Sequence, residues 1–179
     1  MILSDQEIVQ EIERKNIVIE PFRPSALGSN SYDVHLGKTL ATYQEEILDA
    51  KTPNTLRFFD IPKEGFVLMP DTLYLGATEE YTETHNHVPF LEGKSSVGRL
   101  GIDIHATAGK GDVGFKNFWT LEISVKMPVR VYAGMPIGQL IYFAIKGSVL
   151  TPYHVKQSAK YNEVSPLPKE SQMWRNFSK

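Results

Sequence analysis

Short runs of alternating apolar and polar residues, separated by turn residues, constrain the fold of this chain more than any other feature. A half-buried strand sends successive side chains to opposite faces, so its sequence alternates with a period of two. Residues 32–36 alternate in this way, and residues 17–19 are of the β-branched type that strands favour. Similar runs, most of them bounded by glycine, proline, asparagine or aspartate, lie at 66–69, 73–77, 88–91, 102–105, 119–125, 129–132 and 137–145. Many short strands joined by turns predict a closed or double-layered antiparallel β fold.

The first residues of the chain predict a short helix. Ser4 can cap its N-terminus, and Glu7, three residues later, completes a capping box. Leu3 and Ile8 stand where a hydrophobic staple places them, and Ile8 shares one helix face with Ile12.

Two segments lack this periodicity. Residues 44–64 are charged and then contain Pro53 and Asn54, which indicates an excursion from the main fold. From Gln157 onward the chain is polar and contains Pro166 and Pro168, which predicts an irregular C-terminal arm. The sequence shows no internal repeat, and a length of 179 residues favours one domain spanning 1–179.

Charge and cysteine content exclude several function classes. The 19 Lys and Arg residues nearly balance the 21 Asp and Glu residues, and the net charge of -2 argues against a nucleic-acid or membrane surface. No apolar run approaches the ~18 residues of a membrane span, and residues 1–5 lack the pattern of a signal peptide. We therefore expect a cytoplasmic protein. The count of 0 cysteines excludes a disulfide framework, a thiolate nucleophile and the cysteine-ligated zinc of zinc-dependent deaminases.

The segment 92–101 places glycines around two hydroxyl groups and two cations. Lys94, Ser95, Ser96 and Arg99 bring hydrogen-bond donors and positive charge into one turn, as an anionic phosphate chain requires. The spacing is not that of a Walker A loop. Taken alone, the segment fits equally well a helix N-cap followed by a solvated basic turn.

Two carboxylates follow in separate segments. Asp112, in the glycine-rich stretch 105–115, can accept a hydrogen bond from a sugar hydroxyl, although a simple turn residue is favoured there. Glu122 lies in the run 119–125, where alternation puts it on one face with Thr120. Burial raises the pKa of a carboxyl group and suits it to proton transfer near neutral pH. On the pattern alone, a solvent-facing glutamate is favoured.

The histidines give a weaker signal. His85 and His87 stand two residues apart beside Glu83, but no third ligand is evident nearby, so a surface turn is favoured over a metal site. His105 is interpreted as a hydrogen-bonded strand residue rather than a ligand.

Together these segments resemble the dCTP deaminases, members of the trimeric dUTPase-like superfamily. Residues 1–5 are similar to the family's opening, 29–37 to its early strand motif and 70–75 to its Pro-Gly-x-Phe-x-Leu element. Residues 93–99 resemble its phosphate-binding Gly-Arg-Ser-Ser-x-x-Arg motif, and the spacing from there to Glu122 fits without a gap. The resemblance implies a mainly β fold: a distorted antiparallel β-barrel or jelly-roll of the dUTPase-like type, with a short N-terminal helix and an irregular C-terminal arm.

The resemblance also implies which residues bind the nucleotide. Those that would hold the triphosphate, or the water beside the base, are Lys94, Ser95, Ser96 and Arg99. Thr107 and Ala108 would line the cytosine through their backbone, and Thr120 and Leu121 would contact the base. Asp112 would take the sugar 3′-hydroxyl.

The implied chemistry centres on Glu122 as the general acid/base. Ser95 and the Ala108 carbonyl would position the attacking water, in place of zinc. In the tail, Tyr153 and Lys160 would close over the nucleotide.

Three positions depart from the family pattern. Lys94 stands where arginine is common, which keeps the charge but loses bidentate phosphate geometry. Val113 replaces the usual proline after the aspartate, and Val164 stands where a phosphate-binding glutamine often follows the Lys-Tyr pair.

The implied activity is hydrolytic deamination of dCTP to dUTP and ammonia, which supplies dUMP for thymidylate synthesis. The ligands would be nucleotides of the dCTP, dUTP and dTTP type. The partner would be the chain itself, in a homotrimer with sites shared between subunits. Magnesium would be bound through the triphosphate, with no protein metal site.

Three alternatives to this activity remain. Gly109 follows the Thr-Ala pair, as in family members that continue to dUMP, so a bifunctional conversion of dCTP to dUMP and pyrophosphate is the first. The second is a plain dUTPase, a branch that lacks an acidic residue at the position of Glu122. The third is a non-catalytic nucleotide-binding trimer.

Overall fold

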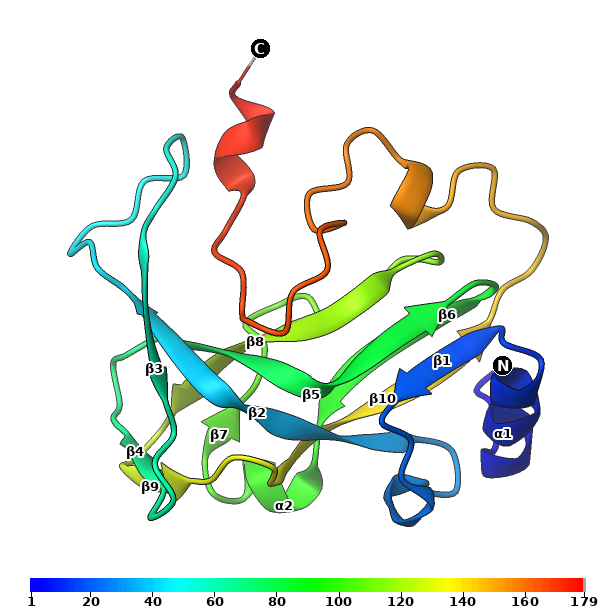
Figure 1. Ribbon diagram of the computed structural model, residues 1–179, viewed down its shortest axis with the longest axis horizontal. Helices are drawn as coiled ribbons and strands as arrows, with labels where there is room; N and C mark the ends of the chain where they lie inside the picture. Colours follow the sequence, from blue (N-terminus) through cyan, green and yellow to red (C-terminus); the bar gives the residue numbers. More distant parts are fainter. Residues whose placement is uncertain (179) are drawn as a thin grey trace.

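The framework of the molecule is an antiparallel sheet of eight strands, which a computed structural model describes within residues 1–178. One path through the sheet runs in the order β6 (His87–Gly93), β10 (Pro136–Ala144), β2 (Tyr32–Tyr43), β5 (Tyr74–Thr84), β8 (Lys116–Val125) and β7 (Ile102–Asp103). Off this path, β1 (Ile17–Glu20) pairs with β5 and β3 (Leu56–Asp60) pairs with β2. The sheet curls into a nearly closed barrel (Figure 1).

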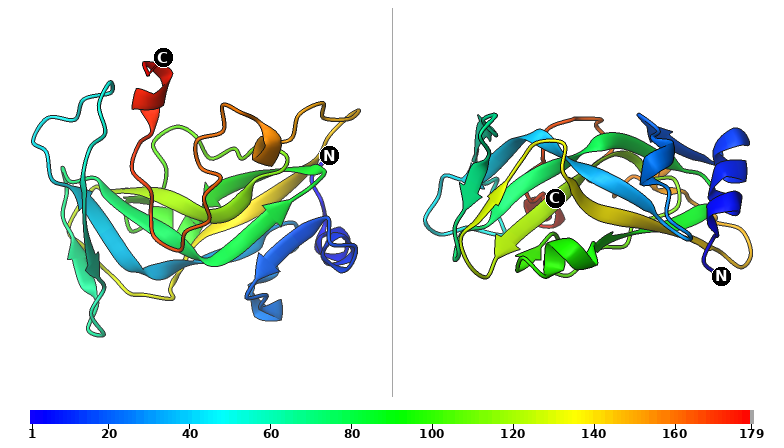
Figure 2. Two further views of the ribbon diagram at one scale, coloured as in Figure 1. Left: turned by 45° about the horizontal axis from the view of Figure 1, so that its top comes forward. Right: turned by 90° about the horizontal axis from the view of Figure 1, so that it is seen from below.

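Shorter elements complete the fold. A second, two-stranded sheet joins β4 (Phe66–Leu68) to β9 (Val129–Val131). The helices are α1 (Asp5–Glu13), the single turn α2 (Ser95–Gly98) and the 3-10 turns η1 (Pro24–Ala26), η2 (Tyr153–Val155) and η3 (Met173–Asn176). Figure 2 shows α1 at one end of the barrel. Within residues 1–178, no helix has the length and apolar character needed to cross a membrane.

The strands predicted from alternation are all present, with different bounds in places. The run 102–105 shortens to the two residues of β7, whereas β5 continues well past the predicted end at residue 77. The prediction for residues 44–64 is wrong in part, because this excursion contains β3. Only β2 pairs with β3, which leaves most of its side chains exposed or half-buried, so its sequence does not alternate.

The predicted N-terminal helix is confirmed, together with its cap. The Ser4 hydroxyl accepts a hydrogen bond from the backbone N–H of Glu7 at 3.3 Å. Ile8 is fully buried, so the apolar face of the helix packs on the core. The helix ends before Lys15, whose φ of 60° places it in the left-handed region and turns the chain towards β1.

The core lies inside the curl of the sheet. Its fully buried side chains come from α1, β1, β2, β4, β5, β8 and β10, and include Ile8, Ile17, Leu36, Leu40, Leu68, Leu121, Ile123, Ile137 and Leu140. Burial of one such side chain contributes about 1.5–3 kcal/mol. The alternation read from the sequence therefore supplies the main driving force for this architecture.

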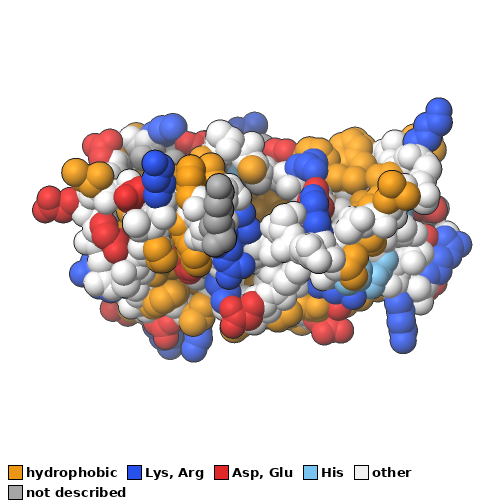
Figure 3. All heavy atoms as spheres, turned by 90° about the horizontal axis from the view of Figure 1, so that it is seen from above, with side chains coloured by type: hydrophobic (Ala, Val, Ile, Leu, Met, Phe, Trp, Pro, Cys, Tyr) orange, Lys and Arg blue, Asp and Glu red, His pale blue; other side chains and the backbone are white. Residues whose placement is uncertain are grey.

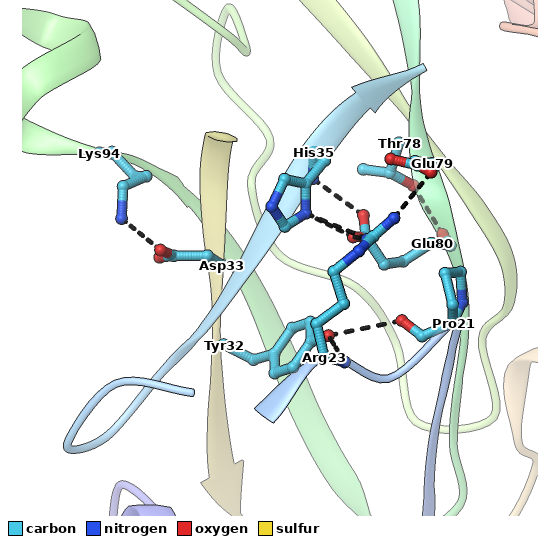
Figure 4. Close-up of polar contacts among 9 residues, drawn as sticks. All are labelled: Pro21, Arg23, Tyr32, Asp33, His35, Thr78, Glu79, Glu80 and Lys94. Carbon is cyan, nitrogen blue, oxygen red and sulfur yellow. Dashed lines mark hydrogen bonds and ion pairs between the residues drawn. The ribbon is translucent and has the colours of Figure 1, made fainter. Parts of the chain in front are cut away.

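A buried ionic cluster fastens the loop before β2 to the sheet (Figure 4). The Glu80 carboxylate on β5 is fully buried and accepts hydrogen bonds from Arg23 Nη1 at 2.6 Å and from the backbone N–H of His35 at 2.8 Å. His35 Nδ1 lies 2.6 Å from the same carboxylate. The backbone N–H of Arg23 donates to the Tyr32 hydroxyl at 2.7 Å. Removing one partner would leave a buried charge uncompensated, which typically costs about 3–5 kcal/mol.

The C-terminal arm, residues 153–178, runs along β8 on the face of the sheet opposite α2 (Figure 1). It contains η2 and η3 and no strand within the described residues, as the irregular composition predicted. The space between the arm and β8 contains the cavity described below.

His87 makes folding depend on pH. Its side chain is 7% exposed, and its Nδ1 lies 3.8 Å from Glu11 Oε2. Burial lowers the pKa of His87 below its ordinary value of 6.5, and the Glu11 carboxylate offsets only part of this effect. The unfolded chain therefore takes up a proton at a higher pH than the folded chain does.

We expect the free energy of unfolding to decrease as pH falls below about 6.5, towards the lower pKa of folded His87. The stabilisation is fully present above that range. Urea unfolding at pH 7 and pH 5 measures the change, and His87→Leu should show a smaller decrease than the parent chain. Equal decreases in both proteins would rule out His87 as the source.

Candidate active site

A cavity of about 580 Å³ lies between β8 and the C-terminal arm. Its walls come from β8, the loop 106–112, the end of β2 and the arm. Seen from the arm side, this face of the molecule carries Lys and Arg side chains close to Asp and Glu side chains, with hydrophobic side chains between them (Figure 3). A ligand entering here meets both apolar surface and charges of both signs, as the base and the phosphates of a nucleotide would require.

The structure brings some of the predicted site residues together in this cavity and leaves others outside it. Those in the lining are Ala108, Asp112, Thr120, Glu122 and Tyr153. Those outside the lining are Lys94, Ser95, Ser96, Arg99, Thr107, Leu121 and Lys160. One chain therefore assembles Asp112, Glu122 and two of the four predicted base contacts without the predicted phosphate turn.

Glu122 enters the cavity half-buried from the middle of β8. Its backbone N–H donates to the Ile104 carbonyl at 2.9 Å, and its Oε2 accepts from the backbone N–H of Ala106 at 2.8 Å. These contacts fix the carboxylate against the loop that leads to Ala108. Within residues 1–178 the other carboxylate oxygen has no hydrogen-bond partner, so it can accept from a water or from a base.

The Leu121 side chain is turned away from the cavity, so the predicted base contact would have to come from its backbone. That side chain is fully buried in the core, because β8 alternates and Leu121 lies opposite Thr120 and Glu122. Thr107 lies on the exposed part of the loop before Ala108 and does not line the cavity.

The loop 109–112 is held close to β6 by backbone pairing. The Gly109 carbonyl accepts from the Leu91 N–H at 2.7 Å, and the Gly111 N–H donates to the Pro89 carbonyl at 2.8 Å. A Cβ on Gly109 would lie 2.4 Å from the Leu91 carbonyl oxygen, and one on Gly111 would lie 2.6 Å from the Trp119 ring. Glycine at 109 is thus required by this close approach, and Gly109 does not line the cavity.

Asp112 lies at the end of this loop and is paired with a neighbouring cation. Lys110 Nζ donates to Asp112 Oδ1 at 2.8 Å, and both side chains line the cavity. Both are also partly exposed, so the pair contributes little to stability and can rearrange around a ligand.

The predicted phosphate turn lies outside the cavity, at α2. Ser95, Ser96 and Arg99 are exposed there. Lys94, which precedes the helix, donates from Nζ to Asp33 Oδ2 at 2.6 Å (Figure 4). In this chain the cation of Lys94 is therefore neutralised by a carboxylate of β2, a partner that the sequence pattern did not indicate.

The sequence analysis missed several residues of the cavity. Phe115 packs with tilted rings against Trp119 and Tyr153, at centroid distances of 4.8 and 5.9 Å, and forms an apolar wall. Tyr43 and Tyr161 contribute hydroxyl groups, and burial raises the pKa of both phenols, so they stay neutral near pH 7. These residues come from separate parts of the chain, and no local motif marks them.

The histidine pair divides between two environments. His85 lies in the turn between β5 and β6, as predicted, and its Nε2 is 3.0 Å from Glu83 Oε2. His87, however, is buried, so the interpretation of both histidines as surface residues is wrong for it. Across the described residues 1–178, no three His, Asp or Glu side chains gather closely enough to hold a metal ion.

Comparison with known proteins identifies the family. The sequence profile of the family described as dCTP deaminase-like matches residues 2–145. The chain belongs to the dCTP deaminase-like family. A Leptospira biflexa protein named dCTP deaminase, dUMP-forming, is 47% identical over 179 residues, which is 100% of this chain and 99% of that one. A protein of the same name from Clostridium acetobutylicum is 50% identical over 161 residues, 90% of each chain.

A solved structure supports the same fold. The crystal structure of the 2′-deoxycytidine 5′-triphosphate deaminase from Agrobacterium tumefaciens superposes with a TM-score of 0.64 at 22% identity. The match covers 84% of this chain and 50% of that chain. The predicted family, the mainly β fold class with its short N-terminal helix, and the enzyme class, a dCTP deaminase, are thus confirmed.

Proposed function

We propose that this dCTP deaminase-like enzyme converts dCTP to dUMP, pyrophosphate and ammonia, in a deamination followed by hydrolysis of the triphosphate. The observation that supports the second step is the naming of both relatives as dUMP-forming, at 47% and 50% identity. Gly109 adds no independent support, because its missing side chain is accounted for by the close Leu91 carbonyl.

We propose Glu122 as the general acid/base of the deamination. Water attacks C4 of cytosine, and Glu122 takes one proton of the water and gives it to N3. As the tetrahedral intermediate collapses, Glu122 takes the second proton from the C4 hydroxyl and gives it to the amino group, which leaves as ammonia while the C4 carbonyl forms. The half-buried carboxylate is held by the Ala106 N–H on one oxygen, which leaves the second oxygen for this transfer. Ala108 in the same lining is suited to position the water through its carbonyl.

We propose that a second copy of the chain completes the site in a homotrimer. The turn that carries Ser95, Ser96 and Arg99 is exposed and lies outside the cavity of its own chain. A neighbouring subunit can present this turn to the cavity, where its hydroxyls and guanidinium would meet the phosphates. Asp112 would then hold the sugar between the two parts of the site.

Magnesium fits this proposal as a companion of the nucleotide. Because no three His, Asp or Glu side chains of the described chain gather around one point, the donor set suits an ion held through phosphate oxygens. When bound, the ion would neutralise phosphate charge. Asp112 and Lys110 would then orient the sugar and the phosphate side, and we propose that the reaction uses no zinc.

The product distinguishes the proposed function from its alternatives. Incubation with dCTP and magnesium, followed by chromatography of an early time course, should show dUMP and pyrophosphate in equal amounts with ammonia. Accumulation of dUTP without pyrophosphate would limit the enzyme to deamination. Release of dUMP from dUTP but no reaction with dCTP would indicate a plain dUTPase, and binding without turnover a nucleotide-binding scaffold.

Glu122→Gln should retain dCTP binding and lose deamination. The amide cannot accept the proton of the water, and loss of a positioned general acid/base typically lowers the rate by ~10²–10⁴-fold. Calorimetric titration with dCTP and ammonia release measure the two effects separately. Near-normal turnover in this variant would remove Glu122 from the mechanism.

Subunit mixing tests the shared site. Arg99→Ala and Glu122→Gln should each be inactive as pure proteins, because every site lacks one group. Co-refolded mixtures should regain activity, with about a quarter of the sites intact in a random equimolar trimer. A mixture as inactive as its components would place Arg99 and Glu122 in the same subunit or remove Arg99 from the site.

A further inference from the structure

The C-terminal arm is fastened to β8 by one buried side chain, Asn117. This residue is 4% exposed and lies three positions before Thr120 on the same strand. Asn117 Nδ2 donates to the carbonyls of Tyr161 and Glu163, each at 3.0 Å. Its Oδ1 accepts from the Ser165 N–H at 3.0 Å and from the neighbouring Phe118 N–H at 2.9 Å. Both donor hydrogens and the acceptor oxygen of the amide are therefore used.

Beyond this attachment the arm reaches the base side of the cavity. The backbone N–H of Lys169 donates to Thr120 Oγ1 at 3.1 Å, and that of Ser171 donates to the Tyr43 hydroxyl at 2.9 Å. Ser165, Lys169 and Ser171 all line the cavity. The arm thus forms one wall of the cavity.

The contact with Thr120 links the arm to the chemistry. A hydroxyl group has one hydrogen to donate and two lone pairs to accept with. Because the Lys169 N–H occupies one lone pair, the hydroxyl hydrogen of Thr120 stays available for an acceptor in the cavity, close to Glu122. An acceptor atom of a pyrimidine ring is a ligand of this kind.

We propose that Asn117 is a positioning residue: it fastens the arm across the cavity before substrate binds, so that the arm walls the nucleotide site and orients the Thr120 hydroxyl. This inference rests on the proposed function for the identity of the nucleotide. Asparagine suits the task because one short side chain pairs two carbonyls and one N–H of the arm. An aspartate would set a carboxylate oxygen against both carbonyls.

Asn117→Asp tests the proposal, with Asn162→Asp as the matched control. Asn162 lies on the arm and undergoes the same change of charge, but its amide makes only one contact, of 3.4 Å, with the His154 carbonyl. Hydrogen exchange of the nucleotide-free protein should be faster by about 10-fold across residues 161–172 in Asn117→Asp, because two hydrogen bonds are lost. Exchange in β2 and β10 should not change. The control should match the parent chain throughout.

Steady-state kinetics provides the readout that a merely structural role would not give. KM for dCTP should rise by about 10-fold in Asn117→Asp, while kcat at saturation stays within about 3-fold, because bound nucleotide restores the arm. Unchanged exchange of residues 161–172 would overturn the proposal, and so would faster exchange with an unchanged KM. If the parent chain does not turn over dCTP, the proposed function fails, and calorimetric affinity for dCTP replaces KM in deciding the role of Asn117.

A second variant distinguishes loss of the arm contacts from a general folding defect. Asn117→Ser removes both donated hydrogen bonds without adding charge, and it should reproduce the faster exchange of the arm and the raised KM. If both variants lose the exchange protection of β2 and β10 as well, Asn117 is a general folding residue and the proposal is overturned.

Discussion

The antiparallel pairing of β8 with β5 fixes the position of the catalytic candidate. Leu75 lies opposite Glu122 in the register, and Ala77 lies opposite Thr120. A slip of one residue would exchange the two faces of β8 and send the carboxylate into the core in place of Leu121. Burying an unpaired carboxylate costs several kcal/mol, more than one buried core side chain contributes. The packing of the core therefore maintains the geometry of the cavity.

The predicted site residues are divided between a cavity and an exposed turn, so one chain of the proposed homotrimer would leave the site incomplete. The cavity holds the carboxylates Glu122 and Asp112, whereas Ser95 and Arg99 stand at the surface. Lys94 is engaged by Asp33 of β2, the strand that also contributes His35 to the buried Glu80 cluster. Because β2 is held rigidly by that cluster, the start of the turn at Lys94 is anchored to a fixed strand. This anchoring would keep the shape of the turn in the proposed homotrimer.

The arm shows why irregular segments need side-chain partners. An arm without strand pairing leaves backbone N–H and carbonyl groups that must find other partners when they are covered. Asn117, Thr120 and Tyr43 supply these partners from two strands. The wall that the arm forms therefore depends on these three polar side chains. Sequence patterns place them on strands but do not indicate that the arm contacts them. The sequence contains one indication of this attachment. Asn117 lies on the buried face of β8, where Trp119, Leu121 and Ile123 are all apolar.

Local sequence determined the elements whose stabilising contacts lie within a few residues. The Ser4 cap and the alternation of β8, which puts Glu122 on the face opposite Leu121, are local patterns, and the family resemblance rests on contiguous motifs. Tertiary structure alone decided the pairing of β3 and the burial of His87 against Glu11. It also decided the approach of Gly109 to Leu91 and the attachment of Ser165 to Asn117. The physical reason is distance along the chain: Asn117 and Ser165 are 48 residues apart, and periodicity encodes which face a side chain occupies but not which distant residue meets it.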